Sequence, residues 1–452
     1  MQTTTESVLQ EVSKSRHSMV KLGFTDIDGI LRGKRIHKDK FFSALKDNFG
    51  FCSLAFGWDA ADKCYDNVDV CGTQTGFPDI KAKLDIKTFR KVPWENDLPF
   101  FLAEFVDEEG KEYPLCPRQL LKKMIRRAKY EGFQASCGME FEWFTFKETA
   151  QSLHDSKYAD PKPMTPGMFG YSLLRPSLYN EYFTAIIEDL AAFGVPLEGV
   201  HTETGPGVLE AAILYSDALE AADRATLFKA SVKEIAHRFD MTASFMAKWK
   251  TDLPGCSGHI HQSLWDQTGE HNQFFDENDP NVMSETFKYY VAGQLILLPE
   301  ILPFFLPNVN SYKRLDEEFW ASTHATWGVD NRIAPLRVLP SSMHSTRLET
   351  RLAGSDTNPY LAIAACLGAG LYGIKNKIKL PKQMQGNKKQ TADIFLAQNL
   401  YAATEQLNNS TMAREIFGGN FVDHFVKTRD WEWREFQKSV TDFERKRYFE
   451  II

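Results

Sequence analysis

The stretch Gly138-Met139-Glu140-Phe141-Glu142-Trp143 alternates polar and apolar residues at every second position. Such alternation is typical of a β-strand, because successive side chains point to opposite faces of the sheet. Glu140 and Glu142 are therefore expected on one face, roughly 7 Å apart, with apolar residues on the other. Two carboxylates in a row on one face predict a wall that binds divalent cations.

Three further stretches repeat this chemistry. They are the histidine pair in Gly255-Cys256-Ser257-Gly258-His259-Ile260-His261, the carboxylates Glu203 and Glu210 around a Gly-Pro-Gly turn, and the Arg347-Leu348-Glu349-Thr350-Arg351 strand. Any one of these alone is more often the solvated face of an amphipathic strand. Four together favour divalent cations bridged by phosphate oxygens, because carboxylates, imidazoles and arginines suit that chemistry better than a packed core.

The composition indicates a globular protein that acts on small molecules. The chain has 452 residues, of which 43% are hydrophobic and 25% charged, so we expect two or three domains with a large core. A formal net charge of −7 argues against nucleic acid or an anionic membrane surface as the main partner.

The cysteines and the N-terminus predict a cytoplasmic location. Seven cysteines are scattered without a Cys-x-x-Cys pair, which is typical of a reducing compartment. The start Met1-Gln2-Thr3-Thr4-Thr5-Glu6 lacks the basic and apolar segments of a signal peptide. The most apolar run, residues 291–309, contains Glu300 and three prolines, so it is interpreted as core rather than a membrane span.

The first hundred or so residues predict strands and turns. Residues 20–25 alternate, Asp28-Gly29 is a hairpin turn signal, and residues 30–34 begin the returning strand. Pro117 stands at the expected first position of an amphipathic helix. We therefore predict a small β-rich domain over residues 1–112 and a second domain over residues 113–452.

Strand-like polar stretches and long helical patterns alternate in the second domain. Apolar residues recur at helical spacing over residues 179–193, 218–239 and 358–375. The expected result is an α+β domain, an antiparallel sheet lined with ligands and backed by helices. The polar stretch 382–389 is predicted to be a surface loop.

Taken in order, these motifs resemble the glutamine synthetase family, its type I branch, and within it the γ-glutamylamine synthetases. The resemblance covers nearly the whole chain and includes Arg32-Gly33-Lys34, Asn310-Ser311-Tyr312-Lys313-Arg314-Leu315, Asn331-Arg332, Asn358-Pro359-Tyr360-Leu361-Ala362 and residues 444–449. It implies a β-grasp-like N-terminal domain over residues 1–112 and a catalytic domain with a curved antiparallel sheet over residues 113–452.

The resemblance also implies two or three magnesium or manganese ions where ATP and glutamate meet. Glu142, Glu203 and Glu210 resemble the ligands of the metal on the glutamate side. The ligands of the metal between the ATP phosphates are matched by Glu140, His259 and Glu349.

The remaining site residues follow from the same resemblance. Arg314 matches the arginine that holds the α-carboxylate of the substrate, with Gly255 also in the substrate site. Arg332 and Arg351 match arginines that stabilise the transferring phosphoryl group. The nucleotide site is expected to include His261, Ser263, Arg337 and Arg347.

The implied reaction forms a carbon–nitrogen bond at the expense of ATP. ATP phosphorylates the γ-carboxylate of L-glutamate, an amine attacks the resulting γ-glutamyl phosphate, and ADP and phosphate are released. Positioning and electrostatic stabilisation carry most of phosphoryl-transfer catalysis, which explains why metals and arginines would surround the phosphates.

The amine site departs from the family pattern. Trp320 stands where ammonium-using members have a flap glutamate, and a tryptophan ring covers an apolar group or a cation but accepts no proton. Asp59 and Asp62 match a loop that a neighbouring subunit contributes. We therefore predict an organic amine as second substrate; a Trp320 that only packs the flap, and Asp59 and Asp62 as solvated turn residues, are the plainer readings.

Two alternatives remain open at this stage. One is a true glutamine synthetase that uses ammonium, with Glu317, Glu318 or Asp62 in place of the flap base. The other is a catalytically inactive structural oligomer, which the retention of all six predicted metal ligands disfavours. The resemblance further implies a homo-oligomer of two stacked hexameric rings with active sites shared between subunits. His344 and Gly354-Ser355 are smaller departures near the nucleotide site.

Overall fold

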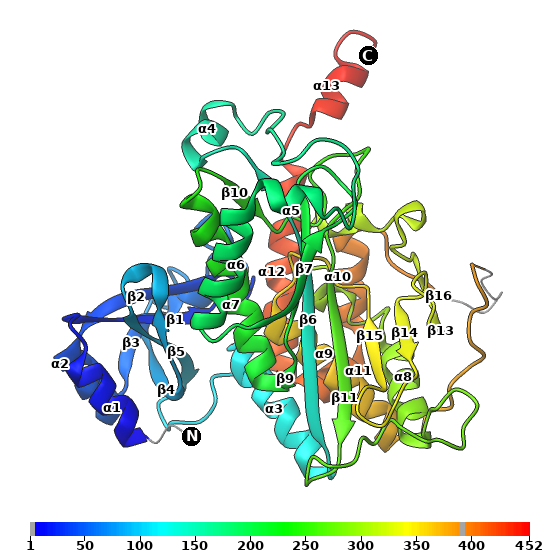
Figure 1. Cartoon of the computed structure of the whole chain (residues 1–452), viewed down its shortest axis with the longest axis horizontal. Coiled ribbons are helices and arrows are strands. Elements are labelled where there is room, and N and C mark those ends of the chain that lie inside the picture. Colours follow the sequence, from blue (N-terminus) through cyan, green and yellow to red (C-terminus); the bar gives the residue numbers. More distant parts are fainter. Residues whose placement is uncertain (1–4, 388–393) are drawn as a thin grey trace.

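Two large β-sheets of different size organise the computed structural model, which describes residues 5–387 and 394–452 (Figure 1). The smaller sheet belongs to the N-terminal part of the chain, and the larger one runs through the middle of the molecule. A third sheet has two strands, β12 (His324–Ala325) and β16 (Ile394–Phe395). The larger sheet carries the predicted site residues.

The smaller sheet has five strands in the order β2-β1-β5-β4-β3. Their bounds are β1 Met19–Thr25, β2 Leu31–His37, β3 Phe49–Cys52, β4 Asp79–Val92 and β5 Leu98–Val106. The predicted hairpin is confirmed: β1 and β2 pair antiparallel, and Gly29 in the turn has a φ of 81°. β1 pairs parallel with β5, so the sheet is mixed.

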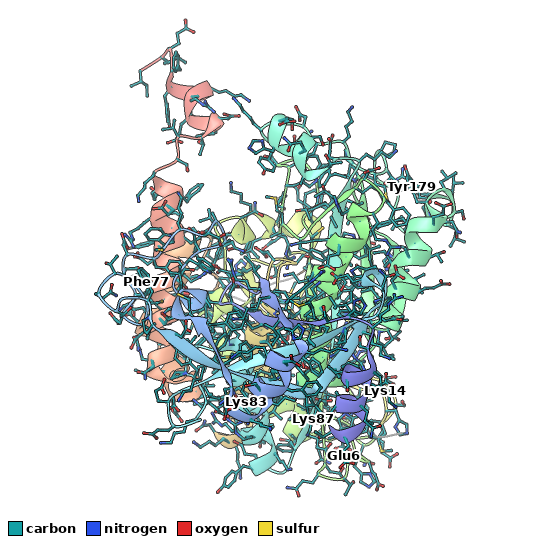
Figure 2. The ribbon with its side chains drawn as sticks, turned by 90° about the vertical axis from the view of Figure 1, so that its left-hand side faces the viewer. Glu6, Lys14, Phe77, Lys83, Lys87 and Tyr179 are labelled. Atoms are coloured by element: carbon teal, nitrogen blue, oxygen red, sulfur yellow. The ribbon has the colours of Figure 1, made fainter. Side chains whose placement is uncertain are left out.

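Helices accompany this sheet, so the prediction of strands and turns alone was wrong. They are α1 (Thr5–Lys14) and α2 (Lys38–Asp47). Val8 and Val12 of α1 are buried four residues apart, on one helix face. A helix this short offers too few apolar positions for its period to be read from the sequence. Figure 2 looks onto the sheet, with Glu6 and Lys14 marking α1 beside it.

The larger sheet follows the order β13-β14-β15-β11-β6-β8-β7, with β9 and β10 also pairing with β6. Its strands are β6 Gln134–Phe146, β7 Leu197–Thr202, β8 Val208–Ile213, β9 Ser216–Asp217, β10 Thr242–Ser244, β11 Gly258–Trp265, β13 Trp327–Val329, β14 Leu336–Leu339 and β15 Arg347–Thr350. The α+β class is confirmed. The sheet is antiparallel except for one pair, since β13 and β14 run parallel.

Helices cover one side of this sheet (Figure 1). Three predicted helices are confirmed as α6 (Asn180–Ala192), α7 (Ala218–His237) and α9 (Pro359–Lys375), and Pro117 opens α3 (Pro117–Tyr130). The others are α4 Ala150–Asp155, α5 Leu174–Leu178, α8 Glu285–Leu297, α10 Leu400–Asn409, α11 Thr411–Phe417, α12 Gly419–Gln437 and α13 Asp442–Tyr448. Asn358 caps α9 by accepting from the Tyr360 amide, and nearly all of α9 is buried.

The run 291–309 lies in α8 and the segment after it, and most of its apolar residues are buried in the main core, as predicted. Among the described residues, no helix is both long and apolar enough to cross a membrane. Residues 382–387 contain no helix or extended strand, and Lys388 and Lys389 of the predicted surface loop lie outside the described residues. Helix α13 projects from the body of the molecule in both views (Figures 1 and 2).

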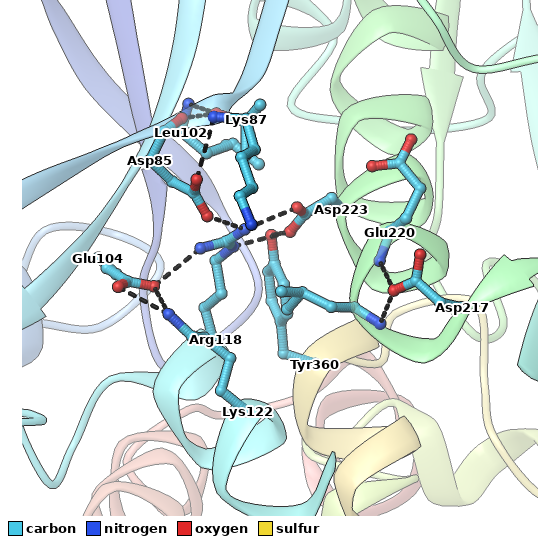
Figure 3. A network of polar contacts seen from close by, with 12 residues as sticks. Asp85, Lys87, Leu102, Glu104, Arg118, Lys122, Asp217, Glu220, Asp223 and Tyr360 are labelled. Atoms are coloured by element: carbon cyan, nitrogen blue, oxygen red, sulfur yellow. Dashed lines mark hydrogen bonds and ion pairs between the residues drawn. The ribbon is translucent and has the colours of Figure 1, made fainter. Parts of the chain in front are cut away.

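A buried arginine joins the two parts of the chain (Figure 3). Arg118, in the first turn of α3, donates to Glu104 on β5 at 2.8 Å and to Asp85 on β4 at 2.9 Å. The same guanidinium donates to both carboxylate oxygens of Asp223 on α7, each at 2.9 Å. Charge-assisted bonds to both parts of the chain fix the small sheet against the helices behind the large one. The boundary at residue 112 stays a prediction.

Candidate active site

Strand register brings the predicted polar residues onto one face of the large sheet. His259 on β11 lies directly opposite Glu140 on β6. Further pairs continue this row on both sides: Glu142 opposite Glu210, His261 opposite Glu349, and Arg337 opposite Glu349. Directly opposed side chains in antiparallel strands have Cβ atoms about 5 Å apart, so alternation along each strand becomes a continuous polar surface across five strands.

Glu140, His259 and Glu349 form a group that fits a divalent cation. One ligand atom from each lies within 4.8 Å of the other two. His259 Nδ1 is 3.1 Å from Glu140 Oε1 and 3.4 Å from Glu349 Oε1. Two hard carboxylate oxygens and one imidazole nitrogen suit magnesium or manganese. These three residues are where the sequence predicted one metal.

The electrostatics of this group keep both carboxylates ionised. Glu349 is only 1% exposed, and burial alone would raise its pKa. The charges of His259, Arg351 and Arg337 outweigh burial and lower the pKa of Glu349 to about 2. Burial likewise opposes ionisation of Glu140, yet its hydrogen bond to His259 lowers its pKa to about 2. An ionised pair of carboxylates is the form that binds a cation.

Glu142, Glu203 and Glu210 are more widely spread. Glu142 Oε2 accepts from the Ser257 amide at 2.7 Å. Glu210 Oε1 lies 3.2 Å from His201 Nε2, and Glu203 Oε2 lies 3.9 Å from His201 Nδ1. Burial, together with the charges of Glu140 and Glu142, raises the pKa of Glu210 to about 8, and the hydrogen bond from His201 opposes this rise. The donor set suits a second cation, although these carboxylates do not converge as tightly as the first group.

Arginines surround the carboxylates. Arg337 Nη1 donates to Glu349 Oε2 at 2.9 Å, and Arg351 Nη1 donates to the other oxygen of Glu349. Arg347 Nε lies 3.2 Å from His261 Nδ1. These three and Arg332 line the same cavity, so it combines convergent cations with convergent carboxylates.

Arg314 is held in place by hydrogen bonds and keeps one unpaired donor, its Nε. It ends the short 3₁₀ helix Ser311–Arg314, is 6% exposed, and its Nη2 donates to the carbonyls of Arg351, Leu352 and Ala353 at 2.8–3.0 Å. Its Nε is buried and finds no acceptor among the described residues. Gly255 packs against it, since a Cβ there would lie 2.6 Å from Arg314 Cγ and 2.4 Å from the Ala247 carbonyl. Arg314 also lines the cavity, and a buried cationic side chain with an unpaired donor fits a carboxylate ligand.

Trp320 lies beside the same cavity. It follows the 3₁₀ helix Glu317–Phe319, has a φ of 58°, and is 59% exposed. Phe319 and Glu318 line the cavity with it. Thr323 donates to Glu317 through its hydroxyl, which ties this segment to the strand that follows.

Asp59 and Asp62 do not line the cavity of their own chain. Asp59 is 9% exposed; its Oδ1 accepts from the Ala61 and Lys63 amides, and its Oδ2 accepts from Trp431 Nε1 on α12 at 3.0 Å. Asp62 is exposed and pairs with Arg32 at 2.8 Å. The reading of Asp59 as a solvated turn residue is therefore wrong, because α12 buries it.

All other predicted site residues line one cavity of about 740 Å³. Ser263 is among them, and its hydroxyl accepts from Trp265 Nε1 at 3.0 Å. Tyr171 and Glu198 also line the cavity and were not predicted from the sequence. Neither was His201, whose ring stacks on Tyr171 at 4.4 Å. A signal for His201 was present, because it stands two positions before Glu203 in the same alternating pattern.

Comparison with known proteins identifies the family. The glutamine synthetase catalytic domain matches residues 114–448. A type-1 glutamine synthetase 2 of Dictyostelium discoideum is 50% identical over 453 residues, covering 98% of this chain and 86% of the relative. A glutamate–isopropylamine ligase of a Pseudomonas species is 36% identical, covering 98% of this chain and 97% of the relative.

The chain belongs to the glutamine synthetase family. A solved structure described as apo GmaS without ligand superposes with a TM-score of 0.84 at 25% identity, covering 99% of this chain and all of the other. The resemblance inferred from the motifs is thus confirmed, and so is the fold. As a member of this family the protein is a carbon–nitrogen ligase of the ATP-dependent glutamate ligases, which use divalent metals in general.

Proposed function

We propose that the protein joins the γ-carboxylate of L-glutamate to an organic amine, using ATP and passing through γ-glutamyl phosphate. The observation that carries the proposal is the composition of the cavity. It places a three-residue cation group and five arginines beside a segment in which Trp320, next to Phe319, stands where a simple ammonium site would need a base.

Each end of the cavity has a task in this reaction. Arg314, with its unpaired Nε, binds the α-carboxylate of glutamate next to Gly255. Arg332 and Arg351 neutralise the phosphoryl group in transfer. His261, Ser263, Arg337 and Arg347 contact the nucleotide.

Metal ions belong to the same proposal. Glu140, His259 and Glu349 would hold one, and Glu142, Glu203 and Glu210 a second. Bound there, magnesium or manganese supplies neutralisation of the phosphate charge. The residues fit this role, because Glu140 and Glu349 are ionised and the cavity already holds arginines for the remaining charge.

We infer that Trp320 selects the amine. Its exposed ring can cover an alkyl or aromatic group or face a cation, and it cannot act as a base. The name of the isopropylamine ligase relative supports an organic amine.

Ammonium is the second candidate, because specific observations favour it too. Glu318 lines the cavity beside Trp320 and can take the proton that Trp320 cannot. The relative at 50% identity is called a glutamine synthetase. In this candidate the reaction is unchanged up to the acyl phosphate and differs only in the nucleophile.

The deciding experiment measures ATP-dependent phosphate release with glutamate and magnesium, comparing ammonium with alkylamines, ethanolamine, polyamines and aromatic amines. Strong release with one organic amine and little with ammonium supports the proposal. A preference for ammonium establishes the second candidate. No release with any amine rejects both and leaves an inactive family member.

We further propose that Asp59 and Asp62 act in the cavity of a neighbouring subunit within a ring-shaped homo-oligomer of two stacked hexamers. They lie outside the cavity of their own chain, which is compatible with action in a neighbour. Mixed oligomers of Glu140→Ala and Asp59→Ala chains test this. Shared sites would restore up to about a quarter of the activity, whereas sites contained in one chain would restore none.

A further inference from the structure

A second cavity lies away from the candidate active site. It has a volume of about 370 Å³ and is bounded by residues 112–114, by α3, and by the loop between α11 and α12. It shares no lining residue with the larger cavity. Its volume falls within the range of small-molecule sites, about 300–1,000 Å³. The proposed reaction makes no use of it.

One wall of this second cavity is electropositive. Helix α12, 19 residues long, begins here, and its N-cap Gly418 provides no side chain to accept the first amide protons. The first N–H groups of a helix have no partner within it and carry its positive dipole end. Lys123 adds a full charge, with Nζ 3.2 Å from the Phe417 carbonyl. A Cβ on Gly419 would meet nothing within 4 Å, so the backbone there is open to a ligand.

Gln119 supplies an independent sign of a ligand. It lines the cavity, is 4% exposed, and its Oε1 is buried without a hydrogen-bond partner among the described residues. Its Nε2 donates to the Phe105 carbonyl at 3.5 Å, which sets the orientation of the amide and leaves the acceptor unpaired. An unpaired buried acceptor costs about 1–3 kcal/mol, which a donating ligand would relieve.

These features specify two ends of one ligand. Lys123 and the start of α12 would bind an anionic group, whereas Gln119 Oε1 would accept a hydrogen bond from an N–H or O–H donor. A fully deprotonated anion has no donor, and a simple amine has no negative charge. Leu120 and Phe421 also line the cavity and provide apolar surface there. Glu112 also lines this cavity and is paired with Arg126 at 2.6 Å.

We propose that this cavity binds a free α-amino acid with an apolar side chain. Its carboxylate contacts Lys123 and the first amides of α12, its ammonium group donates to Gln119 Oε1, and its side chain packs on Leu120 and Phe421. The site lies where the chain passes from the small sheet to the large domain, between β5 and α3.

Isothermal titration of the full-length protein tests the proposal without any need for turnover. Alanine, valine, leucine and methionine are titrated in the presence of saturating glutamate, magnesium and a non-hydrolysable ATP analogue, which occupy the candidate active site. The tightest binder is then compared with its des-amino acid and its amide. Lys123→Met is the test variant, and Lys129→Met, an exposed lysine of the same helix that does not line the cavity, is the matched control.

Saturable binding is expected. Lys123→Met should weaken it at least about tenfold, because one charge-assisted contact is lost, and Lys129→Met should leave it unchanged. Both analogues should bind at least about tenfold more weakly than the amino acid. The proposal is overturned if none of the four amino acids binds, or if Lys123→Met leaves their affinity unchanged. Equal binding of the des-amino acid overturns it as well, because Gln119 would then have no donor.

Discussion

Replacing Arg118 with methionine should cost more stability than any exposed charge on the same helix. Arg118 is 4% exposed and makes four contacts of 2.8–2.9 Å to three carboxylates (Figure 3). Glu104 keeps Lys122 as a partner, but Asp223, 2% exposed, keeps only the hydroxyl of Tyr360 among the residues that the structure describes. A buried charge left without its partner costs about 3–5 kcal/mol.

Urea unfolding at a single chain concentration measures this loss, because the stability of an oligomer depends on concentration. Arg126→Met is the control: its pair with Glu112 is 51% and 41% exposed and contributes at most about 1 kcal/mol. Adding Asp223→Asn to Arg118→Met should recover part of the loss by removing the uncompensated charge. The reasoning is refuted if Arg118→Met costs no more than Arg126→Met.

Three further predictions concern metal, pH and amine. Magnesium with ADP should stabilise the folded protein by about 2.7 kcal/mol at a hundredfold excess over Kd and so raise its melting temperature. Glu349→Gln should abolish this rise in melting temperature. A rise that survives in Glu349→Gln contradicts the cation site. Burial, aided by the charges of Arg429 and Lys427, lowers the pKa of His424 to about 4. The folded state favours neutral His424, so its contribution to the free energy of unfolding is complete above about pH 6.5. That contribution falls by on the order of 3 kcal/mol as the pH drops toward 4, which urea unfolding measures. A His424→Gln variant whose free energy of unfolding has the same pH slope as wild type contradicts this. Trp320→Glu should shift the ratio of phosphate release toward ammonium by about tenfold or more, and an unchanged ratio removes Trp320 from amine selection.

Local periodicity was enough to find the strands that carry the candidate cation group. Glu140, His259 and Glu349 each sit in a strand whose alternation is visible within six residues, because one face packs on the helices and the other faces the cavity. The long helices α7 and α9 were equally visible, since each repeats its apolar period over several turns. The order of the strands in the sheet was not predicted.

Contacts between residues far apart in the chain could not be predicted from the sequence. Asp59 reads as a turn residue by itself, and only its bond to Trp431, 372 positions later, shows that it is buried. The parallel pairing of β13 with β14 depends on the chain between them, which no strand pattern encodes. Tyr171 was missed for the same reason, because its importance lies in the ring of His201 beneath it.

Arg314 shows how such long-range contacts prepare the site before any ligand arrives. A buried guanidinium without a carboxylate is costly, and here the carbonyls of residues 351–353 fix it through Nη2 while Nε stays unpaired. Burial lowers the pKa of Arg314, and the nearby charge of Glu142 opposes that effect. The chain therefore carries the desolvation cost of this cation on folding, and the carboxylate proposed to bind there would gain a rigid, already dehydrated partner with no reorganisation left to make.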